Sequence, residues 1–212
     1  MLFHQFLNYV PKIQIQNLLG EVAHAKMAPE GRIEWVKKAN FNEKPPKTAA
    51  VLILCYPKND ETHLVLIVRN EYPGVHASQI AFPGGKPETE DKNLIDTAFR
   101  EAEEEVGISR LDLTYIKTFS EIYIPPSNYL VTPIFAYSEN PLIFKAQPSE
   151  VAGILELPIA QLLDDQLVVL QTMSTSYAIS IEVPSFKVQQ HLVWGATAMM
   201  LSEFKECLKN VL

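Results

Sequence analysis

The 212-residue chain has few cysteines, fewer basic than acidic residues and no long apolar run. Its two cysteines, Cys55 in an apolar segment and Cys207 near the end, indicate free thiols in a reducing compartment rather than a disulfide framework. Lysine and arginine number 18 against 25 acidic residues, and the net charge of −7 argues against a nucleic-acid-binding surface. The longest apolar run, residues 49–56, is far too short to cross a bilayer. Residues 1–20 lack the basic start and cleavage site of a signal peptide, so we predict a cytoplasmic protein with neither membrane nor nucleic-acid partner.

Signatures of several common catalytic sites are absent too. Gly84, Gly85 and Lys86 lack the four-residue spacer and the Lys-Ser/Thr end of a phosphate-binding P-loop. No nucleophile elbow supports Ser-His-Asp catalysis. Four of the five histidines are scattered without the spacing of metal ligands. The chemistry of this chain must therefore rest on other groups.

What the chain does contain is the composition and patterning of a globular domain, with 47% apolar and 20% charged residues. A helical pattern over residues 4–19, interrupted at Pro11, is followed by a polar stretch, and Pro45 and Pro46 mark a boundary. We expect an N-terminal helical extension over residues 1–45 and a main domain over 46–212. The patterns predict strands over residues 48–56, 63–68, 114–123, 130–137, 151–156 and 176–183, and helices over residues 93–106, 159–164 and 196–208. This mixture predicts an α+β fold, a sandwich with the sheet between helices.

The most informative segment is the acidic end of the predicted helix over residues 93–106. On a helix, Glu101, Glu104 and Glu105 stand at i, i+3 and i+4, so their side chains share one face beside an apolar face that packs on the core. Three crowded carboxylates repel one another unless a cation joins them, and Mg²⁺ or Mn²⁺ suits such oxygen ligands. The alternative is a solvated acidic face, which is what most glutamate runs form.

The residues around this run favour the metal-binding interpretation. Gly84 and Gly85 precede the helix, Gly107 is placed to end it as a C-cap, and Arg100 can brace Glu104 one turn away. This arrangement resembles the Nudix box, G-x5-E-x7-R-E-U-x-E-E-x-G-U, where U is apolar. The second half of the box is matched at Arg100, Glu101, Ala102, Glu104, Glu105, Gly107 and Ile108. In the first half, Asp91 replaces the early glutamate, and eight residues rather than seven separate it from Arg100.

That departure resembles one branch of the Nudix superfamily, the coenzyme A pyrophosphatases. The branch carries an upstream signature, L-L-T-x2-R-S-x3-R-x3-G-x3-F-P-G-G, whose spacing is kept over residues 64–85. Leu64, Arg69 and the Phe-Pro-Gly-Gly end match, whereas departures occur at Val65, Leu66, Asn70, Gly74 and Ser78. Residues 126–133 and 194–198 also resemble this branch.

The resemblance implies a Nudix-like mixed sheet between helices and a hydrolase that depends on Mg²⁺ or Mn²⁺. Carried over to the matching positions, Glu101 and Glu105 are the principal metal ligands, and the carbonyl of Gly85 is a further one. Glu104 is either a third ligand or the group that orients the attacking water, and Arg100 holds Glu104 in position.

Three further residues are candidates for substrate binding, each with a structural alternative. Arg69, at a predicted strand end, either binds a phosphate or forms a surface ion pair. His76 either faces the pocket or makes loop hydrogen bonds, and Ser127 either touches substrate or turns the chain. Glu150, just before a predicted strand, is a further candidate base or ligand, or simply an exposed strand-entry residue.

The resemblance implies a small-molecule nucleoside diphosphate substrate, with coenzyme A or a derivative as the first candidate. Its cleavage would give adenosine 3′,5′-bisphosphate and 4′-phosphopantetheine. The alternative within the same chemistry is ADP-ribose or a dinucleotide. A third hypothesis is a non-catalytic Nudix-shaped ligand sensor, although all of the box's charged residues from Arg100 onward are present. A homodimer is compatible with the resemblance.

Overall fold

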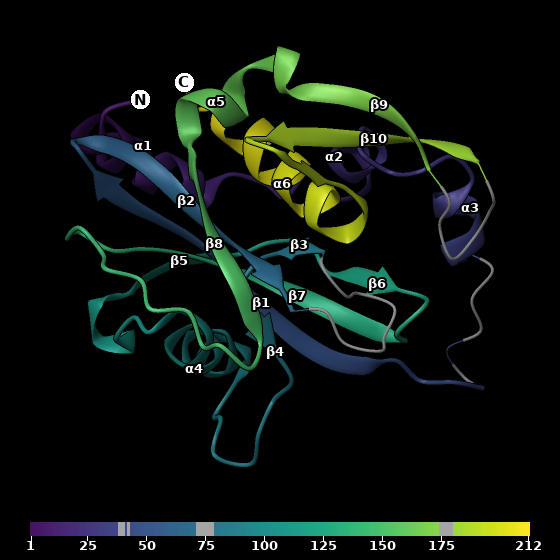
Figure 1. The fold of residues 1–212 in the computed structure, drawn as a ribbon, viewed down its shortest axis with the longest axis horizontal. Helices are drawn as coiled ribbons and strands as arrows, with labels where there is room; N and C mark the ends of the chain where they lie inside the picture. The colour runs from purple at the N-terminus through teal and green to yellow at the C-terminus, as the bar shows by residue number, and fades with distance from the viewer. Residues whose placement is uncertain (38–40, 42, 71–78, 174–179) are drawn as a thin grey trace.

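The apolar segments of the sequence form one large mixed sheet with further elements on both of its faces (Figure 1). The computed structural model describes residues 1–37, 41, 43–70, 79–173 and 180–212, and the statements below concern this part of the chain. Within it the sheet has eight strands in the order β3-β2-β1-β7-β5, with β4 paired to β1, β6 to β7 and β8 to β2. Their bounds are β1 Lys47–Lys58, β2 Glu61–Arg69, β3 Ile80–Ala81, β4 Gly84–Gly85, β5 Thr114–Thr118, β6 Ile122–Ile124, β7 Tyr129–Tyr137 and β8 Val151–Pro158.

Strand β1 explains why both faces of this sheet are covered. It pairs in parallel with β7 and antiparallel with β2, so it lies at the centre of the sheet. Its side chains alternate between two apolar clusters: Ile53 and Cys55 belong to one, and Leu52 and Leu54 belong to the other. A strand that is buried on both faces has a continuous apolar sequence, and residues 49–56 have this pattern.

The two faces of the sheet are covered by different elements (Figure 1). Helix α4 (Leu94–Val106) packs on one face. The other face carries α1 (Phe3–Ile15), α2 (Glu21–Ala25), α5 (Ile159–Leu163), α6 (Gly195–Lys209) and a second sheet of β9 (Val168–Met173), β10 (Ile181–Val188) and β11 (His191–Val193). A short α3 (Arg32–Lys37) and two single-turn helices, Arg110–Asp112 and Asp165–Leu167, complete the described elements. This α/β/α sandwich confirms the predicted fold class.

The N-terminal helix differs from its prediction. An interruption was predicted at Pro11, but α1 runs without a break from Phe3 to Ile15. Proline removes one backbone hydrogen bond from a helix interior. The apolar face of α1, with Phe3, Phe6 and Ile13 buried in the main core, stabilises the helix despite that loss.

One strand prediction also needs correction, and another is tested only in part. The run over residues 114–123 is not one strand but two, β5 and β6, because the chain bends at residues 119–121. At this bend Ser120 turns its N–H and hydroxyl to the carboxylate of Glu203 on α6, which draws the backbone away from a regular ladder. The strand predicted over residues 176–183 lies partly outside the described residues, and β10 is described from Ile181 onward. Strands β9 and β11 were not predicted.

The described helices also bear on membrane association. None of them combines the length and the apolar composition that a bilayer-crossing helix requires.

Candidate active site

Local signals in the sequence determine where α4 begins and ends. The side-chain oxygen of Asn93 accepts hydrogen bonds from the N–H groups of Ile95 at 2.8 Å and Asp96 at 3.0 Å, which caps the first turn. Gly107 follows the last turn with φ of 73°, a left-handed conformation that glycine adopts readily, so the predicted C-cap is confirmed. The apolar face that packs on the sheet consists of Ala98, Ala102 and Val106. The acidic face is thereby turned toward β4.

Gly85 on β4 lies directly against the carboxylate of Glu101. A Cβ atom at residue 85 would stand 2.4 Å from Oε1 and 2.6 Å from Oε2 of Glu101. No side chain larger than that of glycine therefore fits without displacing Glu101. The two residues that the sequence proposed as a carbonyl ligand and a carboxylate ligand are thus brought into contact.

Glu105 is the most deeply buried carboxylate of the group, with 2% of its surface exposed. It accepts a hydrogen bond of 2.8 Å from the N–H of Gly84, the other β4 glycine. Burial raises the pKa of Glu105 to about 7, and the nearby charges of Glu101 and Glu150 raise it as well. The Gly84 N–H and the positive charge of Arg69 lower the pKa but do not offset the burial.

Arg100 links the α4 carboxylates to the loop before the helix through hydrogen bonds. It donates hydrogen bonds to Glu104 at 3.0 Å and to Glu101 at 3.1 Å, and its Nη2 also donates to the carbonyl of Lys86 at 2.8 Å. Its Nε and Nη2 each lie 3.1 Å from an oxygen of Asp91. Hydrogen bonding from Arg100 lowers the pKa of Asp91 to about 2. The residue that departs from the Nudix pattern is therefore an anchor for the arginine.

The carboxylates on this side of the sheet influence one another electrostatically. Burial raises the pKa of Glu101, and the charges of Glu104 and Glu150 add to that effect. Glu150, which lies in the loop before β8, thus adds a charge that raises the pKa of both Glu101 and Glu105. Glu103 points elsewhere and pairs with Arg110 at 2.9 Å.

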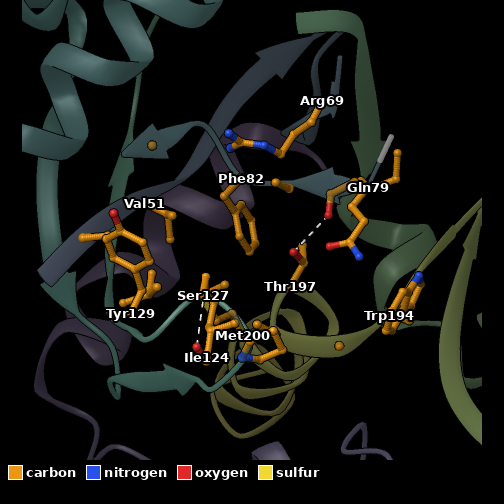
Figure 2. Close-up of a pocket in the computed structure, with 18 of the residues that line it drawn as sticks. Val51, Arg69, Gln79, Phe82, Ile124, Ser127, Tyr129, Trp194, Thr197 and Met200 are labelled. Carbon is orange, nitrogen blue, oxygen red and sulfur yellow. Dashed lines mark hydrogen bonds between the residues drawn. The ribbon is translucent and has the colours of Figure 1, made fainter. Parts of the chain in front are cut away.

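A pocket of about 660 Å³ opens on the other side of the β4 glycines (Figure 2). Its walls come from β1, β2, β3, β4, β6, β7, the turn between β6 and β7, the first two turns of α6, and Pro29 and Arg32 of the N-terminal segment. Among the described residues that line it, every charged one is basic, although the whole chain is acidic: these are Arg32, Arg69 and Lys86. An anionic ligand is the chemical match for such a lining.

Two of the three predicted substrate-binding residues line this pocket. Figure 2 shows Arg69 on one side of Phe82 and Ser127 on the other. The hydroxyl of Ser127 donates a long hydrogen bond, 3.4 Å, to the carbonyl of Ile124 within the bend, so Ser127 both turns the chain and borders the pocket. His76 lies outside the described residues.

Comparison with known proteins decides the family. The NUDIX domain matches residues 46–172 of this chain. A relative from Photorhabdus laumondii, named "Uncharacterized Nudix hydrolase NudL", is 34% identical over 167 residues, which is 74% of this chain and 83% of the relative. The chain belongs to the Nudix hydrolase family.

Solved Nudix structures share the fold at low sequence identity. The Nudix hydrolase RenU from M. smegmatis superposes with a TM-score of 0.54 at 18% identity, over 79% of this chain and 88% of RenU. The NUDIX domain of Shewanella oneidensis NrtR, crystallised with ADP ribose, superposes with a TM-score of 0.52 at 13% identity, over 83% of this chain and 97% of that domain. At these identities the likeness concerns the fold alone.

Nudix hydrolases generally use divalent metal ions, and the residues of this Nudix chain fit such an ion. Carboxylate and carbonyl oxygens are the ligands that Mg²⁺ and Mn²⁺ prefer. Two of the carboxylates, Glu101 and Glu105, have raised pKa values, so a cation beside them would stabilise their charged forms. Among the residues that the structure describes, no three His, Cys, Asp or Glu side chains form a preformed metal-binding group. Glu101 and Glu104 accept hydrogen bonds from Arg100, and Glu105 accepts one from Gly84.

The Nudix fold also brings residues to the pocket that the sequence motifs did not single out. The ammonium groups of Lys47 and Lys86 lie 5.9 and 6.0 Å from the centre of the Tyr129 ring. Trp194 stands across the pocket from Tyr129, and Arg32 enters from the N-terminal segment. The stretches containing Tyr129 and Trp194 carried a family resemblance that could have pointed to the pocket, whereas Lys86 occupies an unspecified position of the Nudix box and Arg32 lies outside the motifs.

Proposed function

We propose that this Nudix hydrolase cleaves the diphosphate bond of a nucleoside diphosphate derivative in a reaction that depends on Mg²⁺ or Mn²⁺. The observation that supports the proposal most strongly is the juxtaposition across β4. Acidic side chains, Glu101 and Glu105, lie behind the glycines, and the described charged residues of the pocket in front are all basic. A diphosphate bound in the pocket against β4 would lie beside the metal site and among the basic side chains.

Some α4 residues would bind the metal ion, and others would keep these ligands in position. In the proposal Glu101, Glu105 and the carbonyl of Gly85 hold the metal. Glu104, which is half-exposed, is a further ligand or orients the attacking water. A bound divalent ion neutralises the diphosphate oxygens and lowers the pKa of water toward neutrality. Arg100 keeps Glu101 and Glu104 oriented through hydrogen bonds of 3.1 and 3.0 Å.

The basic residues nearest β4 would bind the diphosphate itself. Arg69 lies close enough to Glu105 to lower the pKa of its carboxyl, and Lys86 directly follows Gly85 in the chain. Arginine offers a planar donor set that matches phosphate oxygens, and lysine adds a compact positive charge. We assign Ser127 and His76 to further contacts with the substrate.

Coenzyme A or a derivative is the substrate that we favour. The support is the signature over residues 64–85, in which Leu64, Arg69 and the Phe-Pro-Gly-Gly end match the coenzyme A branch. The pocket of about 660 Å³ lies within the usual range for small-molecule sites and can hold a large part of such a ligand. The products would be adenosine 3′,5′-bisphosphate and 4′-phosphopantetheine.

ADP-ribose or a dinucleotide is the second candidate. Asn70, Gly74 and Ser78 depart from the coenzyme A signature, and Gly74 removes a basic side chain that the signature carries. The NrtR domain with the same fold was crystallised with ADP ribose. A non-catalytic sensor is the weakest candidate, because Arg100, Glu101, Glu104 and Glu105 are all present.

A substrate panel tests the proposal. The purified protein is assayed with coenzyme A, ADP-ribose and a dinucleoside polyphosphate in Mg²⁺, in Mn²⁺ and in excess chelator. We expect metal-dependent turnover, with kcat/KM highest for coenzyme A. The Glu105→Gln variant should fold and lose turnover by at least 100-fold, since it removes a charged ligand. Higher kcat/KM for ADP-ribose would favour the second candidate, and no turnover of any substrate would contradict the proposed activity.

A further inference from the structure

Trp194 brings a large aromatic ring to the pocket, and the chemistry proposed above does not use it. It lies between β11 and α6, lines the pocket and is half-buried. Its neighbours Val193 and Ala196 pack in the main apolar cluster, but neither apolar cluster of the described residues includes Trp194. Within the same part of the chain, its side chain makes no hydrogen bond and no contact with another aromatic ring or a cation. The core of the fold therefore leaves this indole to the pocket.

The backbone on both sides of Trp194 is fixed to the rest of the protein. Val193 pairs with Phe186 in the second sheet and is fully buried. On the other side, the hydroxyl of Thr197 donates a hydrogen bond of 3.0 Å to the carbonyl of Ile80 in β3, which Figure 2 shows as a dashed line. The backbone that carries the indole is thus in place before a ligand arrives, which lowers the entropic cost of binding.

The elements around Trp194 contribute no charge to the pocket. The basic lining residues Arg69 and Lys86 come from β2 and from the position after β4. The described lining residues that come from β3 and α6 are all uncharged: Ile80, Ala81, Gly195, Ala196, Thr197 and Met200. Trp194 therefore borders a part of the wall that suits a neutral group rather than a phosphate.

Tyr129, the other half-buried aromatic residue of the wall, has different surroundings. Figure 2 shows Tyr129 and Trp194 on opposite sides of Phe82. The ammonium groups of Lys47 and Lys86 lie 5.9 and 6.0 Å from the centre of the Tyr129 ring, so that ring stands among cations. The indole of Trp194 has no such neighbour among the described residues, and a neutral planar ring is its chemical match.

We propose that Trp194 is a specificity-determining residue that stacks on the base of the substrate's nucleoside. The inference rests on the proposed function, because the diphosphate beside β4 places the rest of the nucleotide in the same pocket. This one pocket of about 660 Å³ is lined both by the β4 glycines and by Trp194. Stacking uses the face of a base and not its hydrogen-bonding edges. Trp194 therefore selects ligands that carry a planar base over ligands that lack one.

Calorimetry in Mg²⁺ measures this selection with adenosine 5′-monophosphate and ribose 5-phosphate, which lacks the base. Loss of one base–aromatic stack should weaken adenosine 5′-monophosphate by about 10-fold in Trp194→Leu and leave ribose 5-phosphate unchanged. Trp194→Phe keeps an aromatic face and should retain most of the affinity. The control is Tyr115→Leu, which removes a ring that is 40% exposed on β5 and does not line the pocket, and it should bind as wild type does.

Fluorescence detects the stack itself. The chain has two tryptophans, so Trp35→Phe leaves Trp194 as the only one, and adenosine 5′-monophosphate should quench its emission saturably while ribose 5-phosphate should not. Circular dichroism checks each variant, and if Trp194→Leu does not fold, the fluorescence titration decides.

These measurements involve no turnover, so they separate this inference from the proposed activity. Unchanged adenosine 5′-monophosphate binding in a folded Trp194→Leu, or no quenching by this nucleotide, would overturn the role of Trp194 even if diphosphate hydrolysis is observed. Quenching by 4′-phosphopantetheine in place of adenosine 5′-monophosphate would also overturn it, because the indole would then contact the other half of the substrate. Base stacking in a protein that hydrolyses no substrate would support this inference and contradict the proposed activity.

Discussion

At the scale of single residues, Gly85 is a position that matters more for the proposed function than for the stability of the fold. A methyl group at this position would meet the carboxylate of Glu101 rather than backbone, at distances of 2.4 to 2.6 Å. The end of a glutamate side chain can move aside at little cost to the fold, but it then leaves the place where we propose that it binds metal.

Gly85→Ala is therefore predicted to reduce activity far more than stability. We expect kcat to fall by at least 10-fold, with an unfolding free energy within about 1 kcal/mol of wild type, because a flexible side chain absorbs the clash. Steady-state kinetics and urea denaturation measure the two quantities. Unchanged kcat in a well-folded variant would show that the contact between Gly85 and Glu101 has no role in the reaction.

The contrast between Asp91 and Arg32 shows what a sequence reveals about single residues. The motif located Arg100 and its glutamates because their spacing is local to one helix. Asp91 looked like a departure from the motif, yet its carboxylate anchors Arg100, since the loop folds back onto the helix. Arg32 joins the pocket only through the tertiary fold, so no pattern near residue 32 could have identified it.

At the scale of elements, Asp91 joins the loop after β4 to the beginning of α4. It accepts hydrogen bonds from the N–H of Glu88 and the hydroxyl of Thr97, each at 2.9 Å, in addition to those from Arg100. Hydrogen bonding from Arg100 is the largest cause of its lowered pKa, about 2 against an ordinary 3.8. A carboxyl with a lowered pKa stabilises the folded state above its ordinary pKa, and this stabilisation is lost as the pH falls toward 2.

Asp91→Asn is predicted to change the pH dependence of stability. At pH 7 the variant should be less stable than wild type by about 2 kcal/mol, because the ion pair with Arg100 is lost and the amide keeps only one of the two acceptor oxygens. Between pH 5 and pH 2 the difference should shrink, since wild-type Asp91 becomes protonated there. Urea denaturation of both proteins at several pH values measures the difference. A difference that stays constant down to pH 2 would be inconsistent with this role of Asp91.

Elements were predictable where local signals decide them. Helix α4 was predicted to within one residue, because Asn93, the apolar period and Gly107 are all local. The bend at residues 119–121 was missed because it depends on Glu203, which lies 83 residues from Ser120 in the chain. Pro11 was taken as a break because the burial of Phe6 and Ile13 against the sheet cannot be read from the helix alone.

At the scale of the whole molecule, Glu203 holds together segments from both ends and the middle of the chain. Its carboxylate, on a residue with 1% exposure, accepts hydrogen bonds from the N–H groups of Gly20 and Ser120 and from the Ser120 hydroxyl, and it lies against His24. Although burial raises its pKa, these hydrogen bonds lower it to about 2 overall. The N-terminal segment, the β5–β6 bend and α6 are thereby linked at one buried point.

Glu203→Ala is predicted to destabilise this junction by about 3 kcal/mol, because removing a buried charged partner leaves several polar groups without acceptors. Hydrogen exchange should become faster in residues 20–27 and in α6 together, and remain unchanged in α4. Glu203→Gln keeps an acceptor and should have a smaller effect. If exchange in residues 20–27 stayed at the wild-type rate, the N-terminal segment would not depend on Glu203. The boundary at residue 45, between the predicted N-terminal extension and the main domain, stays a prediction. The same hydrogen-exchange measurement bears on it.

The claim on which the account depends is that the α4 carboxylates bind a divalent ion beside Gly85. Titration of the wild-type protein with Mn²⁺, followed by electron paramagnetic resonance, tests it directly, with Glu105→Gln and Glu103→Gln as a matched pair. Glu103 lies on the same helix but pairs with Arg110, so it serves as the control. We predict one Mn²⁺ site whose affinity falls at least 10-fold in Glu105→Gln and is unchanged in Glu103→Gln. Equal Mn²⁺ affinity in all three proteins, or no Mn²⁺ binding by wild type, would contradict the account.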